Sequence, residues 1–414
     1  MEWPRISGFG KTTPQGVTMK IKYLAVLLAA AACLAGCSGF WNAPASSGTT
    51  TNTTPTTTTT LSSGYFYVLD KTTAQVISYY IDAGTLTLVG SAVAVPETPI
   101  AIAVAPNDDF LYVSTLNGIY LYKISSGVLT LGNSSQAIYG DPAVAMQVDA
   151  TDSWLVETSG TGALNAVPIE STNGDLNSSS RTCSNSSVVC SVTLTGANIN
   201  QLAIAPNNKY VFVAAATDGT EAFGFNPGNS DPFGSASGPY ATEGPITSTT
   251  GSALSVAVDP NNSLLYIGEE GAISGTGGGL RVFTIGTGGT LSEVSGSPFA
   301  SGGTGSYAVL PRSTANADYV YVASWNGTST GTITGFSVAA TSTSYSLTKL
   351  SSTASTGVYP MSLVEDSKGN FVLAESKGGN PYLDYYIFDT TTAGQLDLIN
   401  TSSSYAGIAL AANQ

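Results

Sequence analysis

Short apolar runs joined by a polar hinge recur along this chain. Residues 102–113, "IAVAPNDDFLYV", pair two such runs, and the phrase returns as "LAIAPNNKYVFV" at 202 and "VAVDPNNSLLYI" at 256. Within each run apolar side chains dominate, and the Pro-Asn hinge suits a tight turn because Pro fixes φ and Asn tolerates unusual backbone angles. Each phrase therefore predicts a β-hairpin.

The hairpin is one part of a longer repeat. Further copies begin at 146, 308 and 362, and the chain ends at residues 408–414 in "IALAANQ", a first strand without its partner. The region after residue 61 begins with "SSGYFYVLD", a second strand without its first. Each copy continues into a third strand and a weak fourth strand, so the spacing of about 44–56 residues predicts seven four-stranded units.

One such sheet has two apolar faces and is not stable alone, but sheets packed face to face around an axis bury both. We therefore predict an all-β fold over residues 62–414, a seven-bladed β-propeller of four-stranded antiparallel blades. The two half-copies predict that the N- and C-terminal strands pair to close the ring, which removes free sheet edges. A β-solenoid or a pair of sandwiches are the alternatives, but solenoid coils have shorter periods and sandwiches need no split termini.

The N-terminal region has a different pattern. Residues 19–36 combine a basic start with an apolar stretch of fourteen residues, which is too short to span a bilayer and typical of an export signal. "LAGC", residues 34–37, resembles the lipobox of bacterial lipoproteins, which implies cleavage before Cys37 and acylation of its thiol. Plain secretion is the alternative. Residues 1–18 are interpreted as an extension upstream of the true start at Met19, or else as a long polar leader.

Residues 37–61 follow as the lipidated cysteine and a Thr/Ser-rich tether that lacks apolar periodicity. We expect the protein at the bacterial cell envelope, exported and held to the membrane by its lipid, on the periplasmic side or the cell surface, and monomeric. Two cysteines remain beyond Cys37, and an oxidising compartment predicts that Cys183 and Cys190 form a disulfide.

Composition excludes several functions. The 414 residues include 13 basic and 27 acidic side chains and no histidine. Cleavage before Cys37 removes four basic residues and one acidic residue, which leaves 9 and 26 and a net charge of −17. Such a surface repels phosphate backbones, so nucleic acid is not an expected partner. Without histidine the chain lacks the usual general base near neutral pH and the commonest metal ligand.

Acidic residues follow the second strand of several units. If these strand ends share one face of the disc, their carboxylates could converge at the mouth of the axial channel and hold Ca²⁺, which prefers oxygen ligands. Solvated loop acids without a shared ligand are the alternative, and no cofactor is required. The candidate residues for this rim are Asp70, Glu157, Asp218, Glu269, Glu270 and Glu375.

Three other side chains are candidates for ligand contacts. Arg281 and Arg312 could bind a carboxylate or phosphate, although a surface ion pair is the simpler expectation for each. Trp325 could stack on a sugar ring or pack as a rim aromatic.

The repeats resemble bacterial propellers of the YVTN-repeat and lactonase-like group. The matching residues are the Pro-Asn hairpins ending in "YV" and "GGTLSEVSGSPFASGG" at 288–303. The resemblance covers about residues 62–414 and implies the propeller fold. It also implies activity on sugar-type lactones, but the site of the enzymatic relatives involves a histidine that this chain lacks.

Three functions remain open. The first is a binding or scaffolding module for an envelope protein or polar ligand. The second is a lactonase-like hydrolase or isomerase without a catalytic histidine, and the third is a surface carbohydrate-binding or adhesion module. Fold alone does not choose among them.

Overall fold

The computed structural model of the chain describes residues 61–412, except 161, 177–182, 184–188, 197, 235–238, 240, 245–250, 274–276 and 343. The expected extension, signal peptide, lipidated Cys37 and tether up to residue 60 lie outside the described residues. Thr58–Gln414 forms one compact unit. The described part contains no helix that is both long and apolar enough to cross a bilayer.

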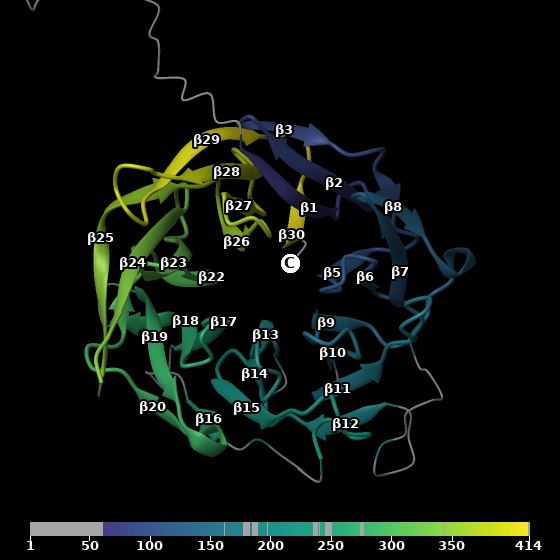
Figure 1. Cartoon of the computed structure of the whole chain (residues 1–414), viewed down its shortest axis with the longest axis horizontal. Helices are drawn as coiled ribbons and strands as arrows, with labels where there is room; N and C mark the ends of the chain where they lie inside the picture. The colour runs from purple at the N-terminus through teal and green to yellow at the C-terminus, as the bar shows by residue number, and fades with distance from the viewer. Residues whose placement is uncertain are drawn as a thin grey trace, which may run out of the picture. The chain divides into compact units, whose positions relative to one another are not determined.

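Seven antiparallel sheets surround a central axis, each with four strands running from the axis outward (Figure 1). The predicted seven-bladed propeller is therefore confirmed. Its innermost strands are β5 (Pro99–Val104), β9 (Ala143–Val148), β13 (Gln201–Ile204), β17 (Ser252–Val258), β22 (Gly305–Ser313), β26 (Pro360–Glu365) and β30 (Gly407–Ala412).

The second and third strands carry most of the fully buried side chains. The second strands are β1 (Ser62–Asp70), β6 (Phe110–Thr115), β10 (Trp154–Ser159), β14 (Tyr210–Ala214), β18 (Leu264–Ile273), β23 (Asp318–Trp325) and β27 (Phe371–Ser376). The third strands are β2 (Gln75–Asp82), β7 (Gly118–Ser125), β11 (Ala163–Pro168), β15 (Thr220–Gly224), β19 (Gly277–Ile285), β24 (Thr332–Ala340) and β28 (Leu383–Phe388).

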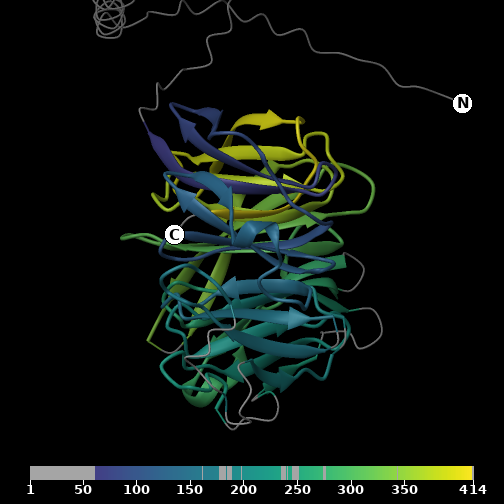
Figure 2. The ribbon, with the colours of Figure 1, turned by 90° about the vertical axis from the view of Figure 1, so that its right-hand side faces the viewer.

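The outer strands are shorter in most blades and more exposed. They are β3 (Thr85–Leu88), β8 (Val128–Leu131), β12 (Cys190–Thr193), β16 (Ala241–Glu243), β20 (Leu291–Glu293), β25 (Tyr345–Ser355) and β29 (Leu396–Ser402). Two-residue strands β4 (Val93–Ala94) and β21 (Phe299–Ala300) pair with β2 and β19, and two short 3-10 turns complete the elements, η1 (Asn133–Ser135) and η2 (Thr287–Gly289). Figure 2 shows the disc from its side, with the blades stacked around it.

Blade 1 joins the two ends of the propeller, as the half-copies predict. β30 pairs antiparallel with β1, with Tyr67 opposite Ala411 and Leu69 opposite Ala409. The remaining blades follow in chain order, blade 2 from β5 to β8 and blade 7 from β26 to β29. The ring is therefore closed by hydrogen bonds between segments more than 330 residues apart.

Alternation along each strand builds the core between neighbouring blades. In β6, Leu111 and Val113 pack toward blade 1, whereas Phe110 and Tyr112 pack toward blade 3. Side chains of a strand point alternately to its two faces. A strand that is almost wholly apolar therefore contributes core side chains to the gaps on both sides of its blade. Seven apolar clusters result, one in each gap between blades.

An aspartate fixes the hairpin between first and second strands in three blades. Asp259 accepts hydrogen bonds from the backbone N–H of Ser263 and Leu264, both at 2.6 Å, and of Asn261 at 3.2 Å. Asp149 and Asp366 make the same contacts four and five residues ahead. Burial raises the pKa of Asp259, and these hydrogen bonds oppose that rise.

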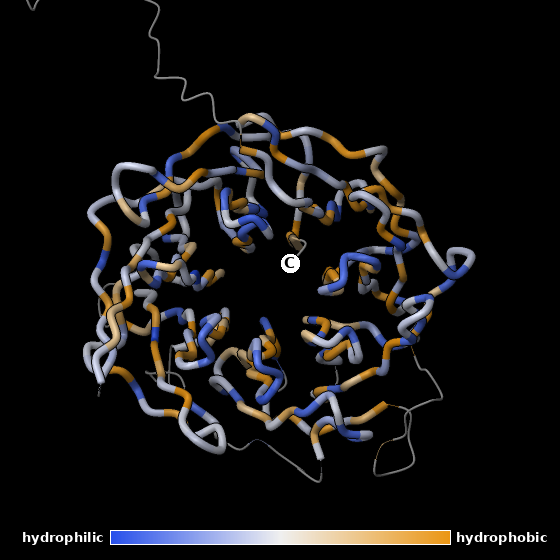
Figure 3. The backbone as a smooth tube through the Cα atoms, in the orientation of Figure 1, coloured by the Kyte–Doolittle hydropathy of each residue, from blue (hydrophilic) through white to orange (hydrophobic). Residues whose placement is uncertain are grey.

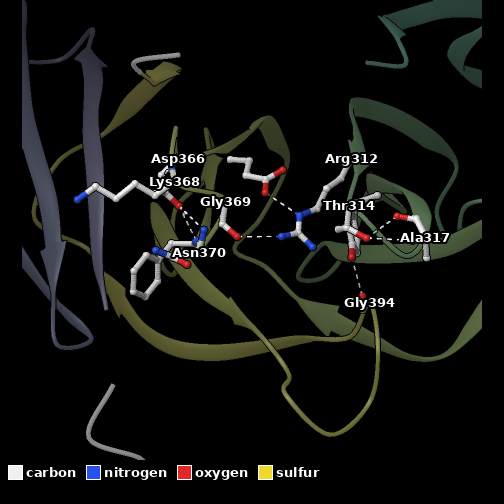
Figure 4. A network of polar contacts seen from close by, with 11 residues as sticks. Arg312, Thr314, Ala317, Asp366, Lys368, Gly369, Asn370 and Gly394 are labelled. Atoms are coloured by element: carbon white, nitrogen blue, oxygen red, sulfur yellow. Dashed lines mark hydrogen bonds and ion pairs between the residues drawn. The ribbon is translucent and has the colours of Figure 1, made fainter. Parts of the chain in front are cut away.

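The hairpin of blade 7 also contacts blades 6 and 1 (Figure 4). Arg312 of β22 donates from Nε to Glu365 at 2.6 Å and from Nη2 to the Gly369 carbonyl at 2.8 Å. Asp366 also accepts the N–H of Gly64 in blade 1 at 3.0 Å. We call this side of the disc the hinge face, because the first-to-second-strand hairpins lie on it.

The predicted disulfide is confirmed. Cys183 and Cys190 are bonded, with their Cα atoms 5.3 Å apart, and Cys190 begins the outer strand of blade 3. Both side chains are buried in the apolar cluster between blades 3 and 4. The bridge thus ties the long excursion after β11 to the core of its blade.

Candidate functional site

A β-bulge interrupts the innermost strand of six blades near its beginning. In β9, for example, Ala143 and Ala145 pair with Ser159 and Thr158, which leaves Val144 without a partner opposite it. A bulge re-aims a side chain, and such features are frequent next to active sites. The bulged residues are Ile100, Val144, Leu254, Tyr307, Met361 and Ile408.

All six bulged residues line the central channel, together with Asn200 from blade 4. We call these seven residues the collar and the side of the disc on which they lie the collar face. Five of them are aliphatic or methionine, and Val144 is 37% exposed. Figure 3 shows hydrophobic positions at the inner ends of the blades around the axis. The channel has a volume of about 1050 Å³, so it can admit a sizeable ligand group.

Polar side chains between neighbouring inner strands stitch the channel wall. Gln147 Oε1 accepts the N–H of Ile204, and Gln201 Oε1 accepts the N–H of Val256, both at 2.9 Å. These bonds run from blade 3 to blade 4 and from blade 4 to blade 5. These bonds use backbone N–H groups and side-chain amide oxygens that would otherwise be available to a ligand. They also fix the inner strands of blades 3, 4 and 5 relative to one another.

The six candidate rim acids do not lie together along the channel. None of them occurs among the described residues that line the channel. Among the described residues no group of three or more Asp, Glu or Cys side chains is placed to hold a metal ion. The acids occupy different registers of their strands, so their side chains enter different gaps between blades or point to solvent.

Glu269 and Asp70 are held by neighbouring groups of the fold. Glu269 pairs with Arg281 at 3.1 Å, and Asp70 accepts the N–H groups of Thr72 and Thr73 in the turn after β1. Asp218 and Glu270 are exposed on the collar side of blades 4 and 5. The Asp70 and Glu269 contacts hold the fold together, and neither carboxylate faces the channel.

Glu157 and Glu375 are buried carboxyl groups in separate gaps. Glu157 lies between blades 2 and 3, where Asn165 Nδ2 donates to its Oε1 at 2.6 Å, and burial raises its pKa to about 7. Glu375 lies between blades 7 and 1 and is 1% exposed. Neither of its carboxyl oxygens has a hydrogen-bond partner among the described residues, and burial raises its pKa to about 8.

Both arginines considered from sequence form ion pairs. Arg281 bridges Glu269 and Glu293, and its Nη1 donates to the Gly244 carbonyl at 2.8 Å. Arg312 bonds Glu365, and its guanidinium lies 3.6 Å from the centre of the Phe388 ring. The expected ion pairs are confirmed, but Arg281 is buried and not at the surface.

An aromatic cluster lies at the collar face where blades 6 and 7 meet. Tyr359 contacts Tyr307 edge to face, with ring centres 4.6 Å apart, and Trp325 at 4.8 Å with an angle of 31° between the rings. All three side chains are half-buried. We call Tyr307, Trp325 and Tyr359 the rim aromatic cluster. Tyr307 also belongs to the collar, so the cluster adjoins the channel.

One residue of this cluster has a strained backbone conformation. Tyr359 has φ +62°, a conformation that costs a bulky residue about 1–3 kcal/mol and is concentrated at functional sites. Gly305 makes room for Tyr307, because a Cβ at Gly305 would lie 2.7 Å from Cζ and the hydroxyl oxygen of that ring. Lys377 donates its backbone N–H to the Tyr359 carbonyl at 3.0 Å, and its Nζ lies 5.7 Å from the centre of the Tyr359 ring.

Sequence reasoning found Trp325 but not the collar or the other two rings. Bulges leave a signal, because each breaks the strict alternation at the start of a first strand, as in "PIAIAV" and "GIALAA". The strained conformation of Tyr359 leaves no comparable signal in one sequence.

Comparison with solved structures supports the fold. A protein from Bacteroides uniformis described as a candidate 6-phosphogluconolactonase aligns with TM-score 0.63 and 17% identity over 84% of this chain and 99% of its own. A protein from Bacteroides fragilis with the same description gives 0.62 and 16%, over 86% and 99%. A protein of unknown function from Desulfotomaculum acetoxidans gives 0.58 and 9%, over 84% and 98%.

At these identities the likeness shows the propeller fold and not a shared activity. No protein-family model matches the sequence, and no curated protein matches it either.

Proposed function

We propose that this protein is a binding module of the bacterial envelope, held to the membrane by a lipid on Cys37, which binds its ligand at the collar. The observation that carries the proposal is the ring of bulged apolar side chains around an open channel of about 1050 Å³. Covering water-exposed apolar surface with a ligand contributes about 25 cal/mol of favourable binding free energy per Å². The collar therefore offers binding free energy from a frame that needs no rearrangement.

The ionisable groups along the channel support binding rather than a reaction. The acids that line it, Glu365 and Asp366, are engaged by Arg312 and by backbone N–H groups of the hinge. Reaction of a lactone with water needs a general base facing the bound carbonyl carbon. The sequence supplies no histidine for that role.

The test compares the protein with a collar variant. Val144→Lys places a charge in the collar at a position already 37% exposed, and Leu398→Lys is a matched control on outer strand β29, 48% exposed. Immobilised wild type and Leu398→Lys are expected to retain the same envelope component, protein or polysaccharide, while Val144→Lys retains at least tenfold less. Equal retention by Val144→Lys, or no retention by wild type, refutes the proposal.

A lactonase-like hydrolase is the second candidate, favoured by the two structural neighbours described as candidate 6-phosphogluconolactonases. Hydrolysis of 6-phosphogluconolactone is measured with the same three proteins. Turnover above the spontaneous rate that Val144→Lys abolishes and Leu398→Lys keeps would favour the enzyme over the binding module.

A further inference from the structure

We propose that the rim aromatic cluster is a binding site for an uncharged saccharide, with Glu270 and Lys377 as its flanking hydrogen-bonding groups. This inference rests on the proposed binding function and names its ligand class. Four observations carry it: the three half-exposed rings, the backbone strain that places one of them, the two charged groups beside them and the adjoining channel.

The rings match the apolar face of a sugar. Trp325 and Tyr359 lie with centres 4.8 Å apart and 31° between their planes, so the two rings stack on each other and Tyr359 supports the half-buried Trp325 ring. An aromatic ring carries negative charge on its face, which attracts the weakly positive C–H groups on one side of a pyranose ring. Trp325 is pinned in place because its Nε1 donates to the Ser329 carbonyl at 2.6 Å.

The flanking groups match the hydroxyls of a sugar. Glu270 is exposed on β18 of blade 5. Burial raises the pKa values of Tyr307 and Tyr359, and the Glu270 carboxylate raises both of them further. Lys377 is also exposed, and its Nζ lies over the Tyr359 ring, 5.7 Å from the ring centre. One acceptor and one donor beside the aromatic rings can bond hydroxyl groups of a sugar.

Charge favours an uncharged ligand over a phosphorylated one. The two arginines within the described residues, Arg281 and Arg312, are each held by glutamates away from the cluster. Bidentate arginine contacts are the usual means of binding phosphate. Lys377 contacts the cluster through the Tyr359 ring, Glu270 opposes its charge, and the whole chain is acidic.

The position beside the channel suggests a chain rather than a single sugar. Tyr307 belongs both to the cluster and to the collar, so a saccharide bound at the cluster can continue toward the channel mouth. The aliphatic collar residues then cover the C–H faces of further units. An oligosaccharide should therefore bind more tightly than its monosaccharide.

The experiment uses the full chain and defined probes. Neutral gluco-, xylo-, manno- and chitin-type oligosaccharides are presented on an array, with 6-phosphogluconate as the charged comparison, and hits are titrated by calorimetry. We expect at least one neutral series to bind. Trp325→Ala is expected to weaken that binding at least tenfold, and Glu270→Gln or Lys377→Gln about threefold or more. Tyr345→Ala, a half-buried tyrosine on outer strand β25, is the matched control and should bind as wild type does.

Because Glu270 and Lys377 are exposed, their variants keep the test valid even where Trp325→Ala fails to fold. Failure of every neutral saccharide to bind, preference for 6-phosphogluconate, or binding unchanged by these substitutions would overturn the inference. If saccharides fail while an envelope component is still lost from Val144→Lys, the binding module stands and only its ligand class is wrong.

Discussion

Glu375 places a carboxyl group in the gap that closes the ring. It packs over the first residue of β30, since a Cβ on Gly407 would lie 2.8 Å from Glu375 Cγ. Burial raises its pKa from 4.5 to about 8, so at neutral pH the folded chain holds a proton that the unfolded chain releases. The free energy of unfolding should therefore fall as the pH rises from about 4.5 to about 8.

Glu375→Gln removes this titration and tests its size. Relative to wild type, the variant should gain roughly 3 kcal/mol of stability between pH 4.5 and pH 7, because each pKa unit corresponds to about 1.4 kcal/mol. Urea unfolding of both proteins at pH 5, 7 and 8.5 measures the difference. Exposed Glu270→Gln is the control and should show no such trend. A stability difference that stays constant with pH would show that Glu375 titrates normally.

At the scale of elements, two hinge aspartates differ in whether they bond only their own blade or also a neighbouring one. Asp259 accepts three N–H groups of its own hairpin, whereas Asp366 accepts the equivalent three and also the N–H of Gly64 in blade 1. Hydrogen bonds to a charged acceptor contribute about 1.5–3 kcal/mol each. The fourth bond should make Asp366 the more costly residue to remove.

We expect Asp259→Ala to destabilise the propeller by about 3 kcal/mol and Asp366→Ala by about 1–2 kcal/mol more. Thermal and urea unfolding of the two variants measure this. Equal losses would mean that the Gly64 contact adds nothing to ring closure.

The closing strand gives a second prediction at this scale. Removal of residues 406–414 leaves the inner edge of β1 unpaired and uncovers apolar residues of blades 7, 1 and 2. The truncated chain should lose its cooperative unfolding transition and associate through the free edge. Calorimetry and light scattering measure both effects, and removal of 413–414 alone is the control. A truncated chain that melts near the wild-type temperature would show that β30 is not needed for closure.

At the scale of the molecule, the hairpin repeat was enough to predict the ring, its seven blades and the split blade 1. The predicted first strands begin one to four residues late, for example at 102 where β5 begins at Pro99. The cause is the bulge, because regular alternation resumes only after the unpaired residue. The positions of the acids could not be predicted, since a shift of one residue along a strand sends a side chain to the opposite gap.

The anchor proposal is tested on the whole chain. Cys37→Ser removes the thiol that the lipobox resemblance marks for acylation, so the variant should leave the membrane fraction and lose incorporation of labelled fatty acid. Cys33→Ser, four residues earlier, is the matched control and should remain anchored. Retention of Cys37→Ser in membranes with its label would contradict a lipid on that residue.

The bulges have a consequence for how such a protein can vary. A bulged residue faces no partner across the strand pair, so exchanging its side chain leaves register, turns and the gaps between blades unchanged. Substitutions at the six bulged positions could therefore convert an apolar channel mouth into a polar or charged one on an intact ring. Different residues of the same inner strands determine ligand preference and folding, so either property can change in evolution while the other is kept.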